Sequence, residues 1–89
     1  MIHKTLHIRN RAGLHTRPAA MLVKLSAKFK SNIQLERDGF EINAKSIVGV
    51  MTLAAEFGSQ LELEVEGEDE IEAAEAIVEL FDTGFGELT

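Results

Sequence analysis

The sequence contains no cysteine, no tryptophan and no tyrosine, and it has a single proline. Without cysteine the chain can form neither a disulfide framework nor a thiolate metal site, and nothing points to an oxidising compartment. No apolar run approaches the roughly 20 residues of a membrane-spanning helix. The first residues do not resemble a signal peptide, because His3, Lys4 and His7 interrupt them. We therefore expect a cytoplasmic protein without direct membrane insertion.

The composition is that of a small globular domain. The 89 residues are 45% hydrophobic and 27% charged, proportions typical of a folded chain rather than a disordered one. A chain of this length forms one hydrophobic core. We find no repeats, linkers or low-complexity segments, and we expect a single domain over residues 1–89.

Charge is divided unevenly along the chain. All nine lysines and arginines lie at or before Lys45, together with only three of the fifteen acidic residues. The first 45 residues therefore carry a net charge of +6 and the rest −12, which should steer acidic groups toward the first half. The basic residues form no dense cluster and tryptophan and tyrosine are absent, so nucleic-acid binding is not expected.

The segment 13–20 places a histidine at the expected start of a helix. His15 or Thr16 can cap this helix, and Pro18 fits its first turn, where a missing N–H leaves nothing unpaired. Free backbone N–H groups at a helix N-terminus attract anions and disfavour imidazolium, so His15 should offer a neutral, nucleophilic ring nitrogen. Arg17 adds a planar fork that suits phosphate oxygens. The pattern predicts a phosphoryl-accepting site; the alternative is an ordinary capping histidine beside a solvated arginine.

Apolar periodicity predicts seven elements in the order βαββαβα. The expected ranges are strand 2–8, helix 16–30, hairpin strands 32–37 and 40–44, helix 47–55, strand 60–66 and helix 69–82. Asp38-Gly39 favours a tight hairpin turn, which pairs Leu35 with Ile42. This order predicts an α+β fold with a four-stranded, largely antiparallel sheet and three helices on one face.

The first strand also carries the only other histidines. His3 and His7 fall on its polar face, opposite Leu6, and are most simply solvent-facing residues. A metal site built on them would need a third ligand that the sequence does not visibly supply, so no metal site is expected.

The segment 47–55 is apolar on nearly all sides, which is too much for burial against one sheet. Ser46 is a good N-cap for it, and Gly58 is expected to end the element. We expect three of its residues in the core: Val50, Leu53 and Ala54. Three others should stay partly exposed and form a patch that could meet a partner: Ile47, Val48 and Met51.

The last helix has an acidic first turn, which suits the positive end of the helix dipole. Gly84 is expected to cap its C-terminus. The residues expected to face the core are Ile71, Ala74, Ile77, Val78 and Phe81.

Two motifs together resemble one protein family. Residues 13–20 read Gly-Leu-His-Thr-Arg-Pro-Ala-Ala, and residues 44–51 read Ala-Lys-Ser-Ile-Val-Gly-Val-Met. Both resemble segments of the HPr family, the histidine-containing phosphocarrier proteins of the bacterial phosphoenolpyruvate-dependent phosphotransferase system. The resemblance covers essentially the whole chain and implies an open-faced β-sandwich. The segment 81–86 also resembles the nitrogen-related branch, which regulates rather than feeds sugar uptake.

The resemblance implies a function for the first motif. His15 would accept a phosphoryl group on Nδ1 from phosphorylated enzyme I and pass it to an enzyme IIA domain. Arg17 would stabilise the phosphohistidine, helped by the backbone N–H groups of Thr16 and Arg17. Such a protein is a carrier without substrate turnover of its own, and it needs no cofactor. The resemblance also implies a monomer that makes transient contacts.

It implies a regulatory function for the second motif. Ser46 would be phosphorylated by an ATP-dependent HPr kinase/phosphorylase, and the modified form could bind a transcriptional regulator. An ordinary N-cap serine is the alternative, since such a cap exists with or without a kinase. The residues expected to contact partners are Thr16, Ala20, Lys24, Lys45, Ile47, Val48 and Met51.

Overall fold

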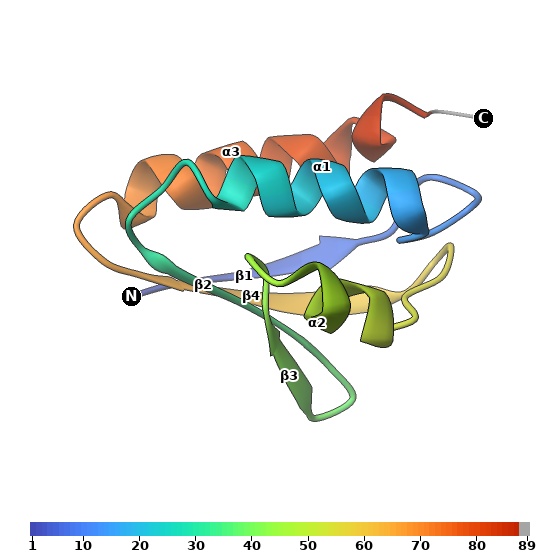
Figure 1. The fold of residues 1–89 in the computed structure, drawn as a ribbon, viewed down its shortest axis with the longest axis horizontal. Helices are drawn as coiled ribbons and strands as arrows, with labels where there is room; N and C mark the ends of the chain where they lie inside the picture. Colours follow the sequence, from blue (N-terminus) through green and yellow to red (C-terminus); the bar gives the residue numbers. More distant parts are fainter. Residues whose placement is uncertain (88–89) are drawn as a thin grey trace.

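The computed structural model describes residues 1–87 and contains one sheet with helices on one of its faces (Figure 1). The strands are β1 (Ile2–His7), β2 (Asn32–Arg37), β3 (Phe40–Asn43) and β4 (Gln60–Glu66). The helices are α1 (Thr16–Ser26), α2 (Ile47–Thr52) and α3 (Glu70–Asp82), followed by the 3-10 turn η1 (Gly84–Gly86). The predicted element order and the α+β open-faced sandwich are confirmed.

The four strands form a fully antiparallel sheet in the order β1-β4-β2-β3. In the hairpin, Arg37 pairs with Phe40 and Leu35 with Ile42, as the alternation predicts. Asp38 and Gly39 both adopt positive φ (52° and 84°), which matches the tight turn that suits strand twist. One face of the sheet is therefore consistently apolar.

The core lies between this apolar face and the helices. Helix α3 packs on β1 and β4, and α1 lies beside both α3 and α2. The buried sheet residues come from alternate positions of the strands, and the buried helix residues come from one side of each long helix. They include Leu6, Leu22, Ile33, Leu35, Leu61, Leu63, Val65, Ile77 and Phe81.

Helix α1 ends at Ser26, four residues before the predicted end. The chain tightens there, because the N–H groups of Lys28 and Phe29 donate to carbonyls three residues back rather than four. Beyond this turn, the N–H groups of Lys30 and Ser31 donate to the carboxylate of Asp69, the N-cap of α3. A partner distant in sequence thus fixes the chain that follows the helix, and apolar spacing within 16–30 carries no sign of it.

Helix α2 ends at Thr52, so the predicted end near residue 55 is wrong, and Gly58 lies in the following loop. The guanidinium of Arg37 donates to the carbonyls of Leu53 (3.1 Å) and Ala54 (2.7 Å), which satisfies the end of the helix. Ala54 turns to positive φ (50°) and is exposed, whereas Ala55 is buried in its place. Burial of Val50 and Leu53 is confirmed.

Helix α3 differs from its predicted core stripe at one position. Ala74, Ile77 and Phe81 are buried and Val78 packs at the edge of the core, but Ile71 is 59% exposed. Ala73 is fully buried instead. Two adjacent alanines allow the helix backbone to approach the sheet closely, a role that hydrophobicity alone does not reveal. Gly84 follows the helix with positive φ (60°), as expected of a glycine that ends a helix.

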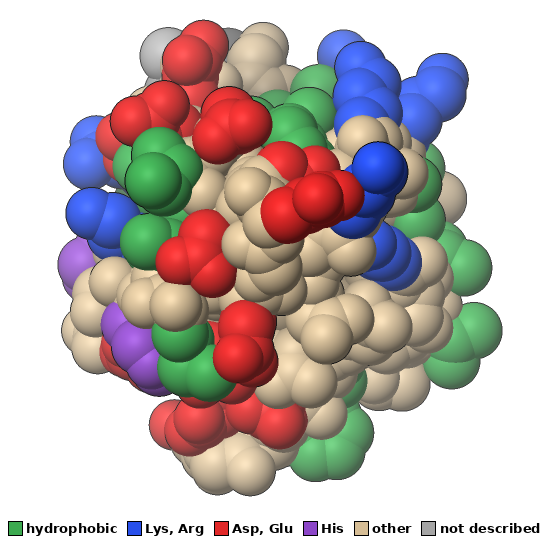
Figure 2. Space-filling view, turned by 90° about the vertical axis from the view of Figure 1, so that its left-hand side faces the viewer, with side chains coloured by type: hydrophobic (Ala, Val, Ile, Leu, Met, Phe, Trp, Pro, Cys, Tyr) green, Lys and Arg blue, Asp and Glu red, His purple; other side chains and the backbone are tan. Residues whose placement is uncertain are grey.

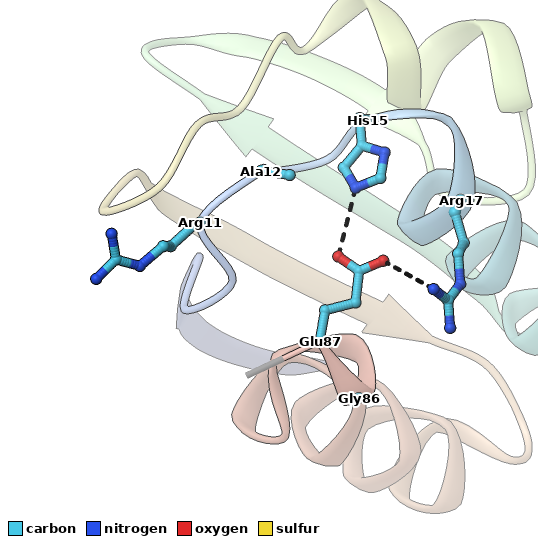
Figure 3. A pocket seen from close by; sticks show the side chains of 6 residues that line it. All are labelled: Arg11, Ala12, His15, Arg17, Gly86 and Glu87. Carbon is cyan, nitrogen blue, oxygen red and sulfur yellow. Dashed lines mark hydrogen bonds and ion pairs between the residues drawn. The ribbon is translucent and has the colours of Figure 1, made fainter. Parts of the chain in front are cut away.

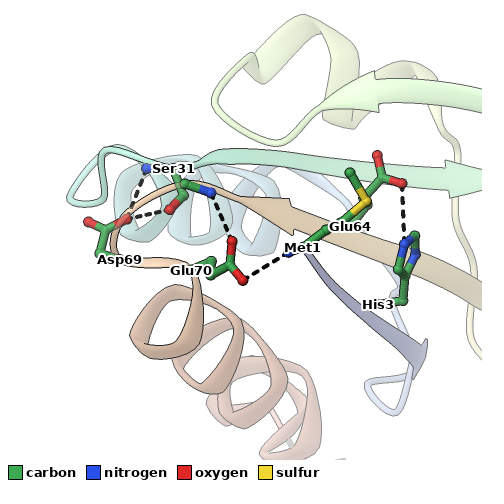
Figure 4. A network of polar contacts seen from close by, with 7 residues as sticks. Met1, His3, Ser31, Glu64, Asp69 and Glu70 are labelled. Atoms are coloured by element: carbon green, nitrogen blue, oxygen red, sulfur yellow. Dashed lines mark hydrogen bonds and ion pairs between the residues drawn. The ribbon is translucent and has the colours of Figure 1, made fainter.

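A polar clamp joins the segment between α1 and β2 to the start of α3 (Figure 4). The Asp69 carboxylate accepts hydrogen bonds from the Ser31 hydroxyl and from the N–H groups of Lys30 and Ser31. The Ser31 hydroxyl first, then the Lys30 N–H, lower the pKa of Asp69 to about 2. Nearby, Glu70 binds the N-terminal ammonium group at 2.9 Å. The clamp therefore stays ionised well below the usual range for a carboxyl group.

The charge division along the sequence is only partly a division in space. Figure 2 shows the end of the molecule opposite the start of α1, where acidic side chains are widespread but lysines or arginines also appear. The sheet brings the two halves of the chain together, because β4 lies between β1 and β2. Across the described residues, no helix is long and apolar enough to cross a membrane.

Candidate functional site

The loop between β1 and α1 is held tightly at Gly13. Its N–H donates to the Asn10 carbonyl (3.1 Å), its carbonyl accepts from Asn10 Nδ2 (2.8 Å), and the next N–H, of Leu14, donates to Ala55 O (2.9 Å). Gly13 has positive φ (70°), and a Cβ there would lie 2.5 Å from Ala55 O. Only glycine allows this close approach, which sets the path of the chain into His15.

His15 is the N-cap of α1, the first of the two predicted capping positions. Its ring makes no capping hydrogen bond, so it projects from the helix start, and the side chain is 43% exposed. Helix geometry leaves the N–H groups of Thr16 and Arg17 without intrahelical acceptors, while Pro18 has no N–H to satisfy. The first turn therefore offers two backbone donors beside the ring, as an anion site requires.

A carboxylate joins His15 and Arg17 (Figure 3). Glu87 Oε1 lies 3.4 Å from His15 Nε2, and Glu87 Oε2 lies 3.7 Å from a guanidinium nitrogen of Arg17. The Glu87 side chain is only 15% exposed, compared with 72% for Arg17. The structure thus brings together the two residues predicted to act on phosphate, with a third group between them.

These residues line an open depression of about 510 Å³ at the end of the molecule. Arg11, Ala12 and Gly86 complete its walls, and the Arg11 side chain extends away from His15 (Figure 3). An open site lets another protein reach the ring directly, whereas an enzyme that holds a small substrate encloses most of it.

Ser46 caps α2, as predicted. Its hydroxyl oxygen accepts from the Gly49 N–H at 3.1 Å, and the side chain remains partly accessible. The three apolar residues predicted for a docking patch are exposed: Ile47 by 42%, Val48 by 69% and Met51 by 41%. We call these three residues the α2 patch.

The other residues predicted to contact partners divide into two groups. Thr16, Ala20 and Lys24 are all exposed on α1. Lys45 is partly buried, and its Nζ donates to the carbonyl of Phe29 at 2.7 Å, just beyond the end of α1. In this structure Lys45 therefore secures the α1 terminus as well as bordering Ser46.

No pattern in the sequence singles out Glu87 as a site residue. Its position depends on the chain after α3. There Phe85 is buried with positive φ (58°), and its ring packs edge-on against the ring of Phe81, with the two ring centres 4.9 Å apart. Two glycines flanking an aromatic residue signal a tight turn, but they do not show where that turn directs the next side chain.

Among residues 1–87, no group of three or more His, Cys, Asp or Glu side chains is placed to hold a metal ion. The site therefore consists of the His15 imidazole, the Arg17 guanidinium, the Glu87 carboxylate and the backbone N–H groups at the start of α1.

Known proteins are similar to this chain in both sequence and fold. Residues 2–83 match the family model described as "PTS HPr component phosphorylation site". The chain is 53% identical over 87 residues to the phosphocarrier protein HPr of Treponema pallidum, covering 98% of this chain and 99% of that protein. The chain belongs to the HPr family. The resemblance carried by the two motifs is thereby confirmed.

Two solved structures are similar to this chain in both fold and sequence. HPr-C-His from Thermoanaerobacter tengcongensis has a TM-score of 0.95 and 46% identity, with 98% of each chain covered. Crh, the Bacillus subtilis catabolite repression HPr, has a TM-score of 0.66 and 40% identity, covering 90% of this chain and 95% of that one. The chain is thus similar both to phosphocarriers and to a member named for catabolite repression.

Proposed function

We propose that this HPr-family protein is a phosphoryl carrier whose acceptor is His15. It takes a phosphoryl group from phosphorylated enzyme I and delivers it to an enzyme IIA domain. The observation that carries the proposal is an exposed histidine at the N-terminus of α1, two positions before Arg17 and next to helix N–H groups that have no intrahelical acceptor.

The transfer needs little covalent chemistry from the protein. The Nδ1 lone pair of His15 forms a bond to phosphorus while the bond from phosphorus to the donor breaks, and that electron pair returns to the donor. Arg17 and the backbone N–H groups balance the charge on the phosphoryl oxygens. One largely exposed arginine gives moderate stabilisation, which suits a group that must leave again.

The proposal is tested by incubating the protein with enzyme I and phosphoenolpyruvate and then measuring its intact mass. We expect one acid-labile phosphoryl group per chain, which disappears when an enzyme IIA domain is added. An unmodified protein in the presence of a competent enzyme I would rule the proposal out.

Arg17→Ala should slow phosphoryl transfer without unfolding the protein. A charge-assisted hydrogen bond contributes about 1.5–3 kcal/mol, so the rate should fall roughly tenfold to a hundredfold. The side chain is largely exposed, so thermal stability should stay near that of the wild type. Quenched-flow phosphorylation by enzyme I measures the rate. Arg11→Ala is the matched control, because Arg11 lines the same depression but extends away from His15. Equal phosphorylation rates for Arg17→Ala and Arg11→Ala would mean that Arg17 does not assist phosphoryl transfer.

We propose that partners dock on the α2 patch together with Thr16, Ala20, Lys24 and Lys45. The patch is apolar but exposed. The centre of a protein interface is typically apolar, so a bound partner would remove these side chains from water.

Met51→Glu should weaken binding to enzyme I much more than it lowers the melting temperature, because it places a charge within the docking surface. Ile71→Glu is the matched control, since Ile71 is exposed on α3, outside the patch. Titration calorimetry should show a loss of about 2 kcal/mol or more for Met51→Glu alone, as expected of an interface hot spot. A large fall in melting temperature with unchanged binding would mean that Met51 serves the core.

We further propose that Ser46 is a regulatory phosphorylation site for an HPr kinase/phosphorylase. The Ser46 oxygen would attack the terminal phosphorus of ATP, releasing ADP and the hydroxyl proton. A phosphate at this N-cap is favoured by the helix dipole, and it adds up to about two negative charges beside the α2 patch. Docking of an acidic partner surface would then be weakened.

Ser46→Asp should reproduce this effect and slow phosphorylation of His15 by enzyme I. Ser46→Asn is the matched control, because Asn caps a helix about as well as Asp but carries no charge. Separately, an HPr kinase with ATP should give an acid-stable adduct that Ser46→Ala lacks. The regulatory proposal fails if the Asp and Asn variants accept phosphoryl groups equally fast.

A second candidate function is mainly regulatory, in which the Ser46-phosphorylated protein binds a transcriptional regulator and transfer through His15 is secondary. The likeness to Crh, a protein named for catabolite repression, favours it. Adding enzyme IIA to the phosphorylated protein distinguishes the two functions. A carrier loses its phosphoryl group to enzyme IIA, whereas a regulator keeps the phosphate on its serine.

A further inference from the structure

Helices α1 and α3 lie side by side and run in opposite directions, and a groove of about 280 Å³ opens between them (Figure 1). The residues that line it come from both helices and the turn after α3, and most are apolar or small: Leu25, Ala76, Glu79, Leu80 and Thr83. Met21 lies one turn before Leu25 on the same side of α1, and both are only partly buried. The two helices therefore share a seam of apolar side chains that neither the proposed phosphoryl site nor the α2 patch uses.

The two sides of this groove carry opposite charges. On the α1 side, Lys24 and Lys28 lie about one helical turn apart, and both are exposed. On the α3 side, Glu72 and Glu79 lie two turns apart on one face of the helix and are also exposed. Figure 2 views the helices end-on. Near the top of that view, acidic side chains gather on one side and lysines or arginines on the other, with hydrophobic side chains between them.

These charges do not pair with one another across the groove. Within residues 1–87, the ion pairs of the structure involve none of Lys24, Lys28, Glu72 and Glu79. Both sides of the groove are therefore available to the charges of another molecule. A partner that fits must place acidic groups over α1, basic groups over α3 and apolar groups along the seam.

A second copy of this chain meets all three requirements. A rotation of 180° about an axis that runs along the groove, in the plane of contact, places α1 of each copy over α3 of the other. Lysines then face glutamates on both sides of the axis, and the two apolar seams meet in the middle, as in a four-helix arrangement. An axis perpendicular to the helices would instead place lysines over lysines. Charge therefore selects the first arrangement.

The charges also match along the length of the helices. Lys24 adjoins Leu25, which lines the groove together with Glu79, so Lys24 and Glu79 lie at a similar level. Lys28 is one turn further along α1, in the direction of Glu72 and the start of α3, because the two helices are antiparallel. An axis along the groove preserves these levels, so each lysine of one copy meets a glutamate of the other.

We propose that this chain forms a weak symmetric dimer through the α1/α3 groove. The contact joins two short apolar seams and exposed charges, so it belongs among the small, transient interfaces, with a dissociation constant on the order of 0.1–1 mM. The chain is then a monomer at low concentration. Lys24 also belongs to the surface proposed to dock enzyme I, so the second copy and enzyme I would compete for it. That consequence rests on the proposed docking surface, whereas the dimer does not.

Sedimentation equilibrium of the whole chain tests the dimer without any partner protein. Between about 0.05 and 2 mM protein at low salt, the average mass should rise from that of one chain toward that of two. In about 0.5 M salt the association should weaken roughly tenfold, because exposed ion pairs are screened. A chain that remains monomeric at about 2 mM in low salt would overturn the proposal.

Two charge-reversed variants test where the copies meet. One carries Lys24→Glu with Lys28→Glu, and the other carries Glu72→Lys with Glu79→Lys. Each alone should dimerise at least about tenfold more weakly, because like charges then face each other. An equimolar mixture should associate about as well as the wild type, because the acidic α1 of one variant faces the basic α3 of the other. The net charge of −6 becomes −10 and −2, so both variants are negative and their overall charge does not attract them.

The matched control reverses two exposed basic residues outside the groove, Lys4→Glu with Arg9→Glu, and it also has a net charge of −10. It should dimerise as the wild type does. An equal loss in this control would mean that net charge, not the groove, governs association. A dimer that both groove variants leave unchanged, or a mixture that stays monomeric, would show that the copies do not meet through α1 and α3. Circular dichroism establishes that each variant is folded, as expected for substitutions of exposed side chains.

Discussion

His15→Ala is expected to eliminate phosphoryl acceptance from enzyme I altogether. The substitution removes the imidazole at the start of α1, and neither Arg17 nor the backbone N–H groups can form the bond to phosphorus. Stability should change by less than about 1 kcal/mol, because the ring is exposed and makes no capping hydrogen bond. Intact-mass measurement after incubation with enzyme I and phosphoenolpyruvate gives the result directly.

The other histidines provide matched controls. His3 and His7 are exposed on the uncovered face of the sheet, and neither lies at a helix N-terminus. His3→Ala and His7→Ala should therefore accept a phosphoryl group as the wild type does. If His15→Ala retained an acid-labile phosphate and either His3→Ala or His7→Ala lost it, the acceptor would be that histidine and not His15.

The second large effect is expected from Gly13→Ala, which should destabilise the protein by about 2–5 kcal/mol. The positive φ of an alanine there costs about 1–2 kcal/mol, and forcing a methyl group against packed atoms costs roughly 1–3 kcal/mol more. The atoms in question are the carbonyl oxygen of Ala55 and the Cα of Glu56, at 2.5 and 2.9 Å from the new Cβ. These are backbone atoms, so no side-chain rotation can relieve the overlap.

Gly39→Ala separates the two contributions. Gly39 has a similar φ (84°), but a Cβ there would meet nothing within 4 Å. It should therefore lose only about 1–2 kcal/mol, the cost of the backbone conformation. Urea denaturation of both variants measures the difference, and equal losses would mean that close packing at Gly13 contributes little. At a temperature where Gly13→Ala is still folded, its phosphorylation should also be slower, because the loop that positions His15 must shift.

Local patterns were sufficient to predict most of the fold. Strict alternation in residues 60–66 and the Asp38-Gly39 turn correctly predicted β4 and the hairpin register. Helix ends were harder to predict. The Arg37 guanidinium, which binds the carbonyls at the end of α2, comes from another element of the fold. Helix α1 ends in a tightened turn, and the Asp69 carboxylate binds the chain that follows it.

The candidate site divides in the same way. His15 and Arg17 are neighbours in sequence, so spacing alone could place them together at the start of one helix. Glu87 reaches them from 72 residues away, through the buried Phe85 and the amide of Asn10. Most acidic residues lie after residue 45, so the charge pattern along the sequence predicts no carboxylate beside His15. Folding instead returns one carboxylate to the histidine, and this tertiary contact has no local signature.

The most direct measurement follows one labelled phosphoryl group through the relay. The protein is labelled with 32P from phosphoenolpyruvate and a trace of enzyme I, separated from both, mapped by proteolysis at alkaline pH, and mixed in parallel with an enzyme IIA domain. A phosphoryl carrier holds the label on the peptide that contains His15 and passes it to enzyme IIA. Label found on another peptide, or label that stays on the protein when a competent enzyme IIA is present, would contradict the assignment of His15 as the site of transfer.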